Sequence, residues 1–186
     1  MSPSRWEMPP VYLQSGDPEN ENTPTLHAPG LLGARFTMIH PQRTIPVAGS
    51  DAGFSKRYQL IKTDSTMAVA PFASAVAWWA DRTQYLVTTT VTTLGRGRIA
   101  GVFRNAISPG NYGCIQIGGP SPVKLTDASP NPVPSGEFVI PSATNAKAEV
   151  LAAGSAATYP ALGRASSVRN FGNSTCQVEL DVPETT

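Results

Sequence analysis

Residues 85–103 read YLVTTTVTTLGRGRIAGVF, and this stretch decides the fold class. Its first half alternates between larger side chains and threonines, so that Tyr85, Val87 and Val91 share one face of an extended strand. The glycine-rich segment that follows predicts a turn, and Ile99 then opens a second run of apolar residues. A strand, a turn and another strand indicate β-structure rather than helix.

The same pattern continues towards the C-terminus. Tyr112–Ile117, Glu137–Ile140 and Lys147–Leu151 read as further short strands, separated by turns rich in glycine and proline. The clearest alternation is in Cys176–Val182, where apolar residues share one face and polar residues the other. We therefore expect an all-β fold, a small barrel or sandwich of short antiparallel strands.

The N-terminal third of the chain has a different character. Residues 1–55 contain 8 of the 18 prolines, and no strand or helix period persists in them. The sequence therefore predicts an irregular, extended arm over residues 1–55 and a β domain over residues 56–186. Either the arm is a strap that lies on a partner, or it is a loop-rich start to the same domain. It keeps large apolar side chains that a solvated tail would not need: Trp6, Tyr12, Leu13, Leu26, Leu31, Leu32 and Phe36.

Composition excludes several classes of partner. Charged residues make up 15% of the chain and the formal net charge is +1, so bulk electrostatics would not draw it to nucleic acid or an anionic membrane. Neither a secretory signal nor an apolar run long enough to span a membrane is present, so we expect synthesis in a host cytoplasm. Cys114 and Cys176 are then expected to be buried, reduced thiols.

Residue types that carry catalysis are sparse. The two histidines, His27 and His40, both lie in the proline-rich arm, and the sequence has no metal-binding or nucleophile motif. We therefore predict no catalytic, cofactor-binding or metal-binding residue, and no enzymatic activity. A stretch of basic residues without an acid either faces an acidic partner or marks solvated strand ends. It comprises Arg82, Arg96, Arg98, Arg104 and Lys124.

Two adjacent tryptophans, Trp78 and Trp79, stand in the segment 72–80. That segment is compatible with a short helix, but Pro71 and its length make a buried strand as plausible. In a strand the two indoles would point to opposite faces, so that one fills the core and the other anchors a subunit interface. The alternative is that both are buried in a short helix or at a bulge.

Further turn and strand motifs lie at Val76–Arg82, Ile99–Phe103, Pro109–Gly119, Gly136–Pro141 and Leu162–Ala165. Together they are similar to the small head decoration (cement) proteins of tailed bacteriophages. The resemblance covers roughly residues 56–165 and rests on turns and strands rather than on catalytic signatures.

The resemblance implies an all-β structural virion protein that decorates and stabilises the outer surface of a capsid. Its partner would be the major capsid protein, and three copies would often assemble as a homotrimer. On this hypothesis the apolar arm residues grip the capsid, while Trp78 and Trp79 lie at the subunit interface. The alternative from another class is a carbohydrate- or receptor-binding module of a head or tail fibre, because exposed tryptophans would also serve sugar stacking.

Overall fold

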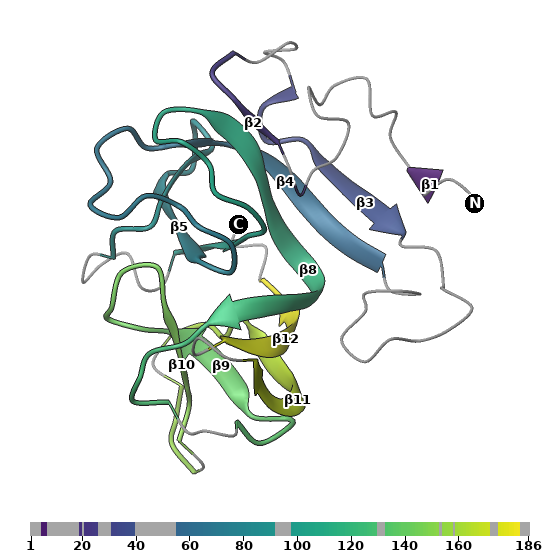
Figure 1. The fold of residues 1–186 in the computed structure, drawn as a ribbon, viewed down its shortest axis with the longest axis vertical. Coiled ribbons are helices and arrows are strands. Elements are labelled where there is room, and N and C mark those ends of the chain that lie inside the picture. The colour runs from purple at the N-terminus through teal and green to yellow at the C-terminus, as the bar shows by residue number, and fades with distance from the viewer. Residues whose placement is uncertain are drawn as a thin grey trace.

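The computed structural model describes residues 5–6, 19, 21–25, 31–39, 55–91, 98–129, 133–152, 154–157, 159–171 and 175–182. The fold is all-β, as the sequence predicts (Figure 1). The strands are β1 (Arg5–Trp6), β2 (Asn22–Thr23), β3 (Arg35–Ile39), β4 (Ser55–Thr63), β5 (Val76–Asp81), β6 (Leu86–Thr88), β7 (Ile99–Phe103), β8 (Tyr112–Lys124), β9 (Phe138–Pro141), β10 (Ala148–Val150), β11 (Gly163–Phe171) and β12 (Thr175–Asp181).

Five strands close a barrel in the order β4, β6, β5, β7 and β8. Closure comes from β8, which pairs back on to β4 in antiparallel register, with Leu60 opposite Cys114. The β4–β6 pair is parallel, through Lys62 with Leu86 and Thr63 with Val87. The other barrel pairings are antiparallel, so the expected antiparallel barrel has one parallel seam.

Strand β8 belongs to two parts of the structure. Its first half pairs with β4, and its second half pairs with β12, which leads on to β11, β9 and β10 (Figure 1). The strand bends where Gly119 adopts a φ of 81°. At the bend the Gln116 side-chain amide donates hydrogen bonds to the carbonyls of Gly118, Gly119 and Pro120, at 3.0, 3.2 and 3.0 Å.

One apolar core serves both parts. It runs without a break from barrel residues such as Ile61 and Phe103 to Val139 and Leu162 beyond the bend. The predicted alternation of the last strand is confirmed, because Cys176, Val178, Leu180 and Val182 are buried and Glu179 is exposed. Cys114 and Cys176 are both buried and form no disulfide, and burial raises the pKa of Cys176 to about 11.

The described part of the N-terminal stretch lies in the same sheet. Strand β3 pairs along β4 from Arg35 opposite Gln59 to Ile39 opposite Ser55, β2 pairs with β8, and β1 pairs with β3. The strands described in this stretch are thus part of the sheet. The expected boundary at residue 55/56 falls at the first residues of β4 and separates no two units among the described residues.

One open alternative is resolved and one local expectation is corrected. The segment 72–80 contains strand β5 rather than a helix. The strand expected over residues 85–93 is reduced to β6, because Tyr85 has a φ of 50° and threonine hydroxyls bind nearby backbone groups after Val87.

Candidate functional site

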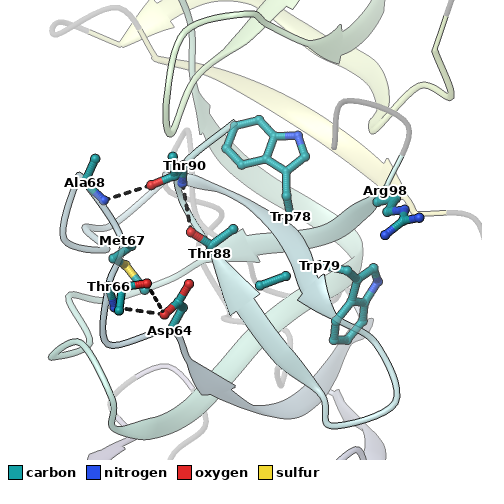
Figure 2. A pocket seen from close by; sticks show the side chains of 10 residues that line it. Asp64, Thr66, Met67, Ala68, Trp78, Trp79, Thr88, Thr90 and Arg98 are labelled. Atoms are coloured by element: carbon teal, nitrogen blue, oxygen red, sulfur yellow. Dashed lines mark hydrogen bonds between the residues drawn. The ribbon is translucent and has the colours of Figure 1, made fainter. Parts of the chain in front are cut away.

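Both tryptophans are buried within the chain. Trp78 is 1% exposed and Trp79 is 9% exposed, and both belong to the main core. Strand β5 has register irregularities on both sides, between Ala77 and Trp78 towards β7 and between Trp79 and Asp81 towards β6. Figure 2 shows the two indoles on opposite sides of β5, but neither projects into solvent, and Trp79 packs edge-on against Tyr85 with ring centroids 6.3 Å apart. The expectation that one indole projects outwards as an interface anchor is therefore corrected.

The two indoles form part of a pocket with a volume of about 360 Å³. Its wall comes from the turn after β4, from β5, from the end of β6 and from the start of β7 (Figure 2). Trp78, Trp79 and Thr88 are buried, whereas Thr66, Ala68 and Arg98 are exposed. The pocket therefore has a buried part beside Trp78 and Thr88 and an accessible, partly polar rim.

A hydrogen-bonded turn positions Asp64 at this rim. The backbone N–H of Asp64 donates to the carbonyl of Val87 on β6 at 2.8 Å. Its Oδ1 accepts from both the backbone N–H and the hydroxyl of Thr66, each at 2.8 Å. Both described hydrogen bonds use the same carboxylate oxygen, so Oδ2 has no hydrogen-bond partner among the described residues.

Two threonine hydroxyls are oriented in a similar way. Thr90 Oγ1 accepts from the backbone N–H of Ala68 at 2.8 Å, and Thr88 Oγ1 accepts from the backbone N–H of Thr90 at 3.1 Å (Figure 2). Each hydroxyl oxygen is held as an acceptor, which leaves its own proton available as a donor. Thr88 and Thr90, which alternate with larger side chains in the sequence, thus line the pocket.

Two further donors belong to the same wall. Trp78 Nε1 is buried and has no hydrogen-bond partner among the residues that the structure describes. Arg98 is exposed, and only its backbone carbonyl takes part in a described hydrogen bond, from the N–H of Trp79 at 2.9 Å. Asp64 and Arg98 are the two charged residues of the lining, so their formal charges cancel.

The residues expected to grip a capsid are found in different places. Phe36 is partly buried and stacks on Tyr58 with ring centroids 5.8 Å apart. Tyr58 belongs to a small buried apolar cluster, and Leu31 packs against this cluster as well. Leu32 is half-buried. Trp6 lies in β1, opposite Met38. Three of the predicted residues lie outside the described part of the chain: Tyr12, Leu13 and Leu26.

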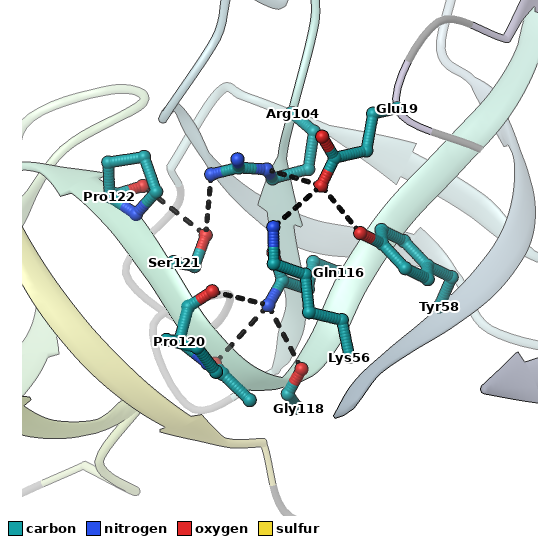
Figure 3. Close-up of polar contacts among 10 residues, drawn as sticks. Glu19, Lys56, Tyr58, Arg104, Gln116, Gly118, Pro120, Ser121 and Pro122 are labelled. Atoms are coloured by element: carbon teal, nitrogen blue, oxygen red, sulfur yellow. Dashed lines mark hydrogen bonds and ion pairs between the residues drawn. The ribbon is translucent and has the colours of Figure 1, made fainter. Parts of the chain in front are cut away.

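An ionic cluster joins the N-terminal segment to the barrel (Figure 3). Glu19 Oε1 lies 2.8 Å from Lys56 Nζ and 3.2 Å from Arg104 Nε, and it accepts a hydrogen bond from the Tyr58 hydroxyl at 2.6 Å. The Lys56 side chain is 0% exposed and that of Arg104 is 12% exposed. Arg104 donates further to Ser121 at 3.4 Å. Arg104 is therefore neither a solvated strand end nor free for an acidic partner.

The cluster has a marked effect on the pKa of Glu19. Burial alone would raise this pKa, but the charge of Arg104 and the hydrogen bonds from Lys56 and Tyr58 outweigh burial and lower it from 4.5 to about 2. The carboxylate is thus held ionised in the folded protein over a wider pH range than in the unfolded chain.

A pH dependence follows from this lowered pKa. Because the folded state releases the Glu19 proton more readily than the unfolded state, the cluster stabilises the fold fully above pH 4.5. That contribution is lost as the pH falls from 4.5 towards 2. Urea denaturation across this window should show wild-type stability falling more steeply than that of Glu19→Gln. Parallel curves for the two proteins would contradict the assignment.

Sequence reasoning missed both the ionic cluster and most of the pocket. The partners Glu19 and Lys56 are far apart in the sequence, and nothing local to Lys56 marks it as buried. One sequence pattern could have identified the turn at the pocket rim, namely Asp-x-Thr at Asp64. The same pattern recurs at Asp81, whose Oδ1 accepts hydrogen bonds from the N–H and the hydroxyl of Thr83 at 2.9 and 2.7 Å. Such patterns are typical of side-chain-capped turns.

Within the described ranges, no group of three or more His, Cys, Asp or Glu residues could hold a metal ion. The described residues also form no helix with the length and hydropathy that crossing a membrane requires. Compared with protein-family models, with curated proteins and with solved structures, the chain shows no match.

Proposed function

We propose that this chain is a structural virion protein that decorates and stabilises the outer surface of a tailed-phage capsid. Three copies would assemble on the shell, with the major capsid protein as their partner. The proposal starts from the resemblance to head decoration proteins, which names a role for an all-β chain without a recognisable catalytic motif.

The observation that carries the proposal is the spatial arrangement of the motifs behind that resemblance. Val76–Arg82, Ile99–Phe103 and Pro109–Gly119 contain β5, β7 and the first half of β8, which are neighbours in the barrel. Gly136–Pro141 and Leu162–Ala165 contain β9 and the start of β11, which pair with each other. Paired strands are what related folds share, so this arrangement supports one common structural unit rather than unrelated turns.

The described surface offers one feature suited to a protein contact. Phe138 is an exposed large hydrophobic residue, at 38%, and the guanidinium of Arg164 lies 3.8 Å from the centre of its ring. An aromatic side chain beside an arginine is typical of the residues that dominate interface energetics. We place a capsid contact here, together with the arm residues Trp6, Tyr12, Leu13 and Leu26.

The proposal is tested with capsids of the parent phage that lack this protein. We expect the added protein to bind their outer surface and to raise the temperature at which they rupture. Deleting residues 1–18 should weaken binding while Glu19 and strands β2 to β12 remain, and Phe138→Ala should weaken it about tenfold. Thermal melts of both variants serve as folding controls, and reconstruction of decorated capsids would give the copy number at each site.

Two outcomes would reject the proposal. If the protein does not bind the capsids, or if decorated and bare capsids rupture at the same temperature, it is not a cement protein. If binding persists unchanged in the deletion variant, the arm is irrelevant to docking and the contact lies elsewhere.

A further inference from the structure

We propose that the pocket between the Asp64 turn and Trp78 binds a neutral saccharide ring. This inference goes beyond capsid decoration and does not depend on it. A protein on the outside of a particle could use such a site on cell-surface glycans, whereas the capsid contact proposed above uses Phe138 and the arm.

The polar groups of the pocket match the chemistry of a polyhydroxylated ligand. A sugar hydroxyl both donates and accepts hydrogen bonds, so it needs partners of both kinds. Asp64 Oδ2 is an acceptor without a described partner, while the Thr88 and Thr90 hydroxyls have their oxygens engaged and their protons available. These groups are already held by backbone hydrogen bonds, so little further ordering is needed on binding.

Trp78 carries an unsatisfied buried nitrogen beside the pocket. A buried N–H group without an acceptor is destabilising, typically by an amount that one hydrogen bond would recover. Trp78 is 1% exposed, its Nε1 lacks a described partner, and its indole forms part of the pocket wall. Because this nitrogen is buried, a ligand oxygen would satisfy it only after the pocket wall shifts to expose it.

Size and charge narrow the ligand class. The volume of about 360 Å³ lies near the lower end of the range for small-molecule sites, about 300–1,000 Å³. Because Asp64 and Arg98 cancel in formal charge, the lining favours a ring without net charge. Trp78 lies beside Thr88 and Thr90 in the lining and supplies an apolar surface for the C–H face of such a ring.

A matched pair of variants tests the proposal. In Asp64→Asn the amide oxygen can still accept the two Thr66 hydrogen bonds, but an N–H₂ group replaces the acceptor Oδ2. Asp81→Asn makes the same change in the equivalent turn at Thr83, and Asp81 does not line the pocket. Both variants should fold, so a difference in ligand binding reports the pocket and not the turn.

The probes are printed arrays of neutral, sialylated and sulfated oligosaccharides, followed by titration of the binding methyl glycosides with tryptophan fluorescence. We expect the full chain to select neutral glycans, with affinity reduced about tenfold in Asp64→Asn and in Arg98→Ala and unchanged in Asp81→Asn. Retention of no glycan, or of charged glycans alone, would overturn the proposal. Equal losses in Asp64→Asn and Asp81→Asn would overturn it as well. None of these results bears on capsid binding.

Discussion

Replacing Glu19 by glutamine is expected to lower the free energy of unfolding by about 3 kcal/mol. The substitution keeps the size of the side chain but removes the negative charge 2.8 Å from the Lys56 ammonium, whose side chain is 0% exposed. Arg104, 3.2 Å away and 12% exposed, loses the same partner. Removing one member of a buried ionic cluster leaves cations that are poorly solvated, which costs more than a surface ion pair contributes. Urea denaturation at neutral pH measures the change.

The matched control is Glu137→Gln. Glu137 is half-buried, and its side chain makes no ion pair with another described residue, so the stability should change by less than about 0.5 kcal/mol. Lys56→Met adds a second check. The double variant Glu19→Gln/Lys56→Met should be more stable than the sum of the single changes predicts, because the buried charge has been removed with its partner. Additive losses would show that the two residues do not interact.

Replacing Gly119 by alanine should destabilise the protein by about 3 kcal/mol or more. Gly119 has a φ of 81°, which by itself costs an alanine roughly 1–2 kcal/mol. A Cβ at this position would also collide with the backbone carbonyl of Ser55 and lie 3.2 Å from the Cα of Lys56. Because both contacts are backbone, the start of β4 would have to move away from the bend in β8.

Gly136→Ala separates these two causes. Gly136 has a similar φ of 88°, but an added Cβ would meet no atom within 4 Å. Its substitution should therefore show the conformational cost alone, about 1 kcal/mol. Thermal melts of the two variants would measure the difference, which reports the close approach of β8 to β4. Equal destabilisation would mean that β4 accommodates the extra methyl group without loss.

Much of the strand content could be predicted from the sequence because alternation is a local property. The polar and apolar faces of Cys176–Val182 were read correctly for this reason. Closure of the barrel was not predictable, since nothing local tells β8 to pair with β4. The parallel seam between β4 and β6 is likewise a property of the assembled barrel. Nothing local in the sequence shows that Glu19 and β3 bind β4, a strand that follows them in the chain.

The candidate site could be predicted only in part. The sequence singled out Trp78 and Trp79 because large aromatic residues are rare, but their burial depends on how the barrel assembles around β5. The sequence pattern places Thr88 and Thr90 in a strand, but it does not report what their hydroxyls bind. The role of Asp64 could not be predicted, because nothing local in the sequence shows that the turn after β4 faces β6.

The long strand β8 also determines how the molecule would respond to mechanical load. Its backbone runs from the barrel, where it pairs with β4, into the sheet that β12 continues. Tension applied between the two ends would travel along covalent bonds instead of across an interface between separate modules. The flanking hydrogen bonds would then be loaded in shear, several at once, instead of being peeled apart one by one.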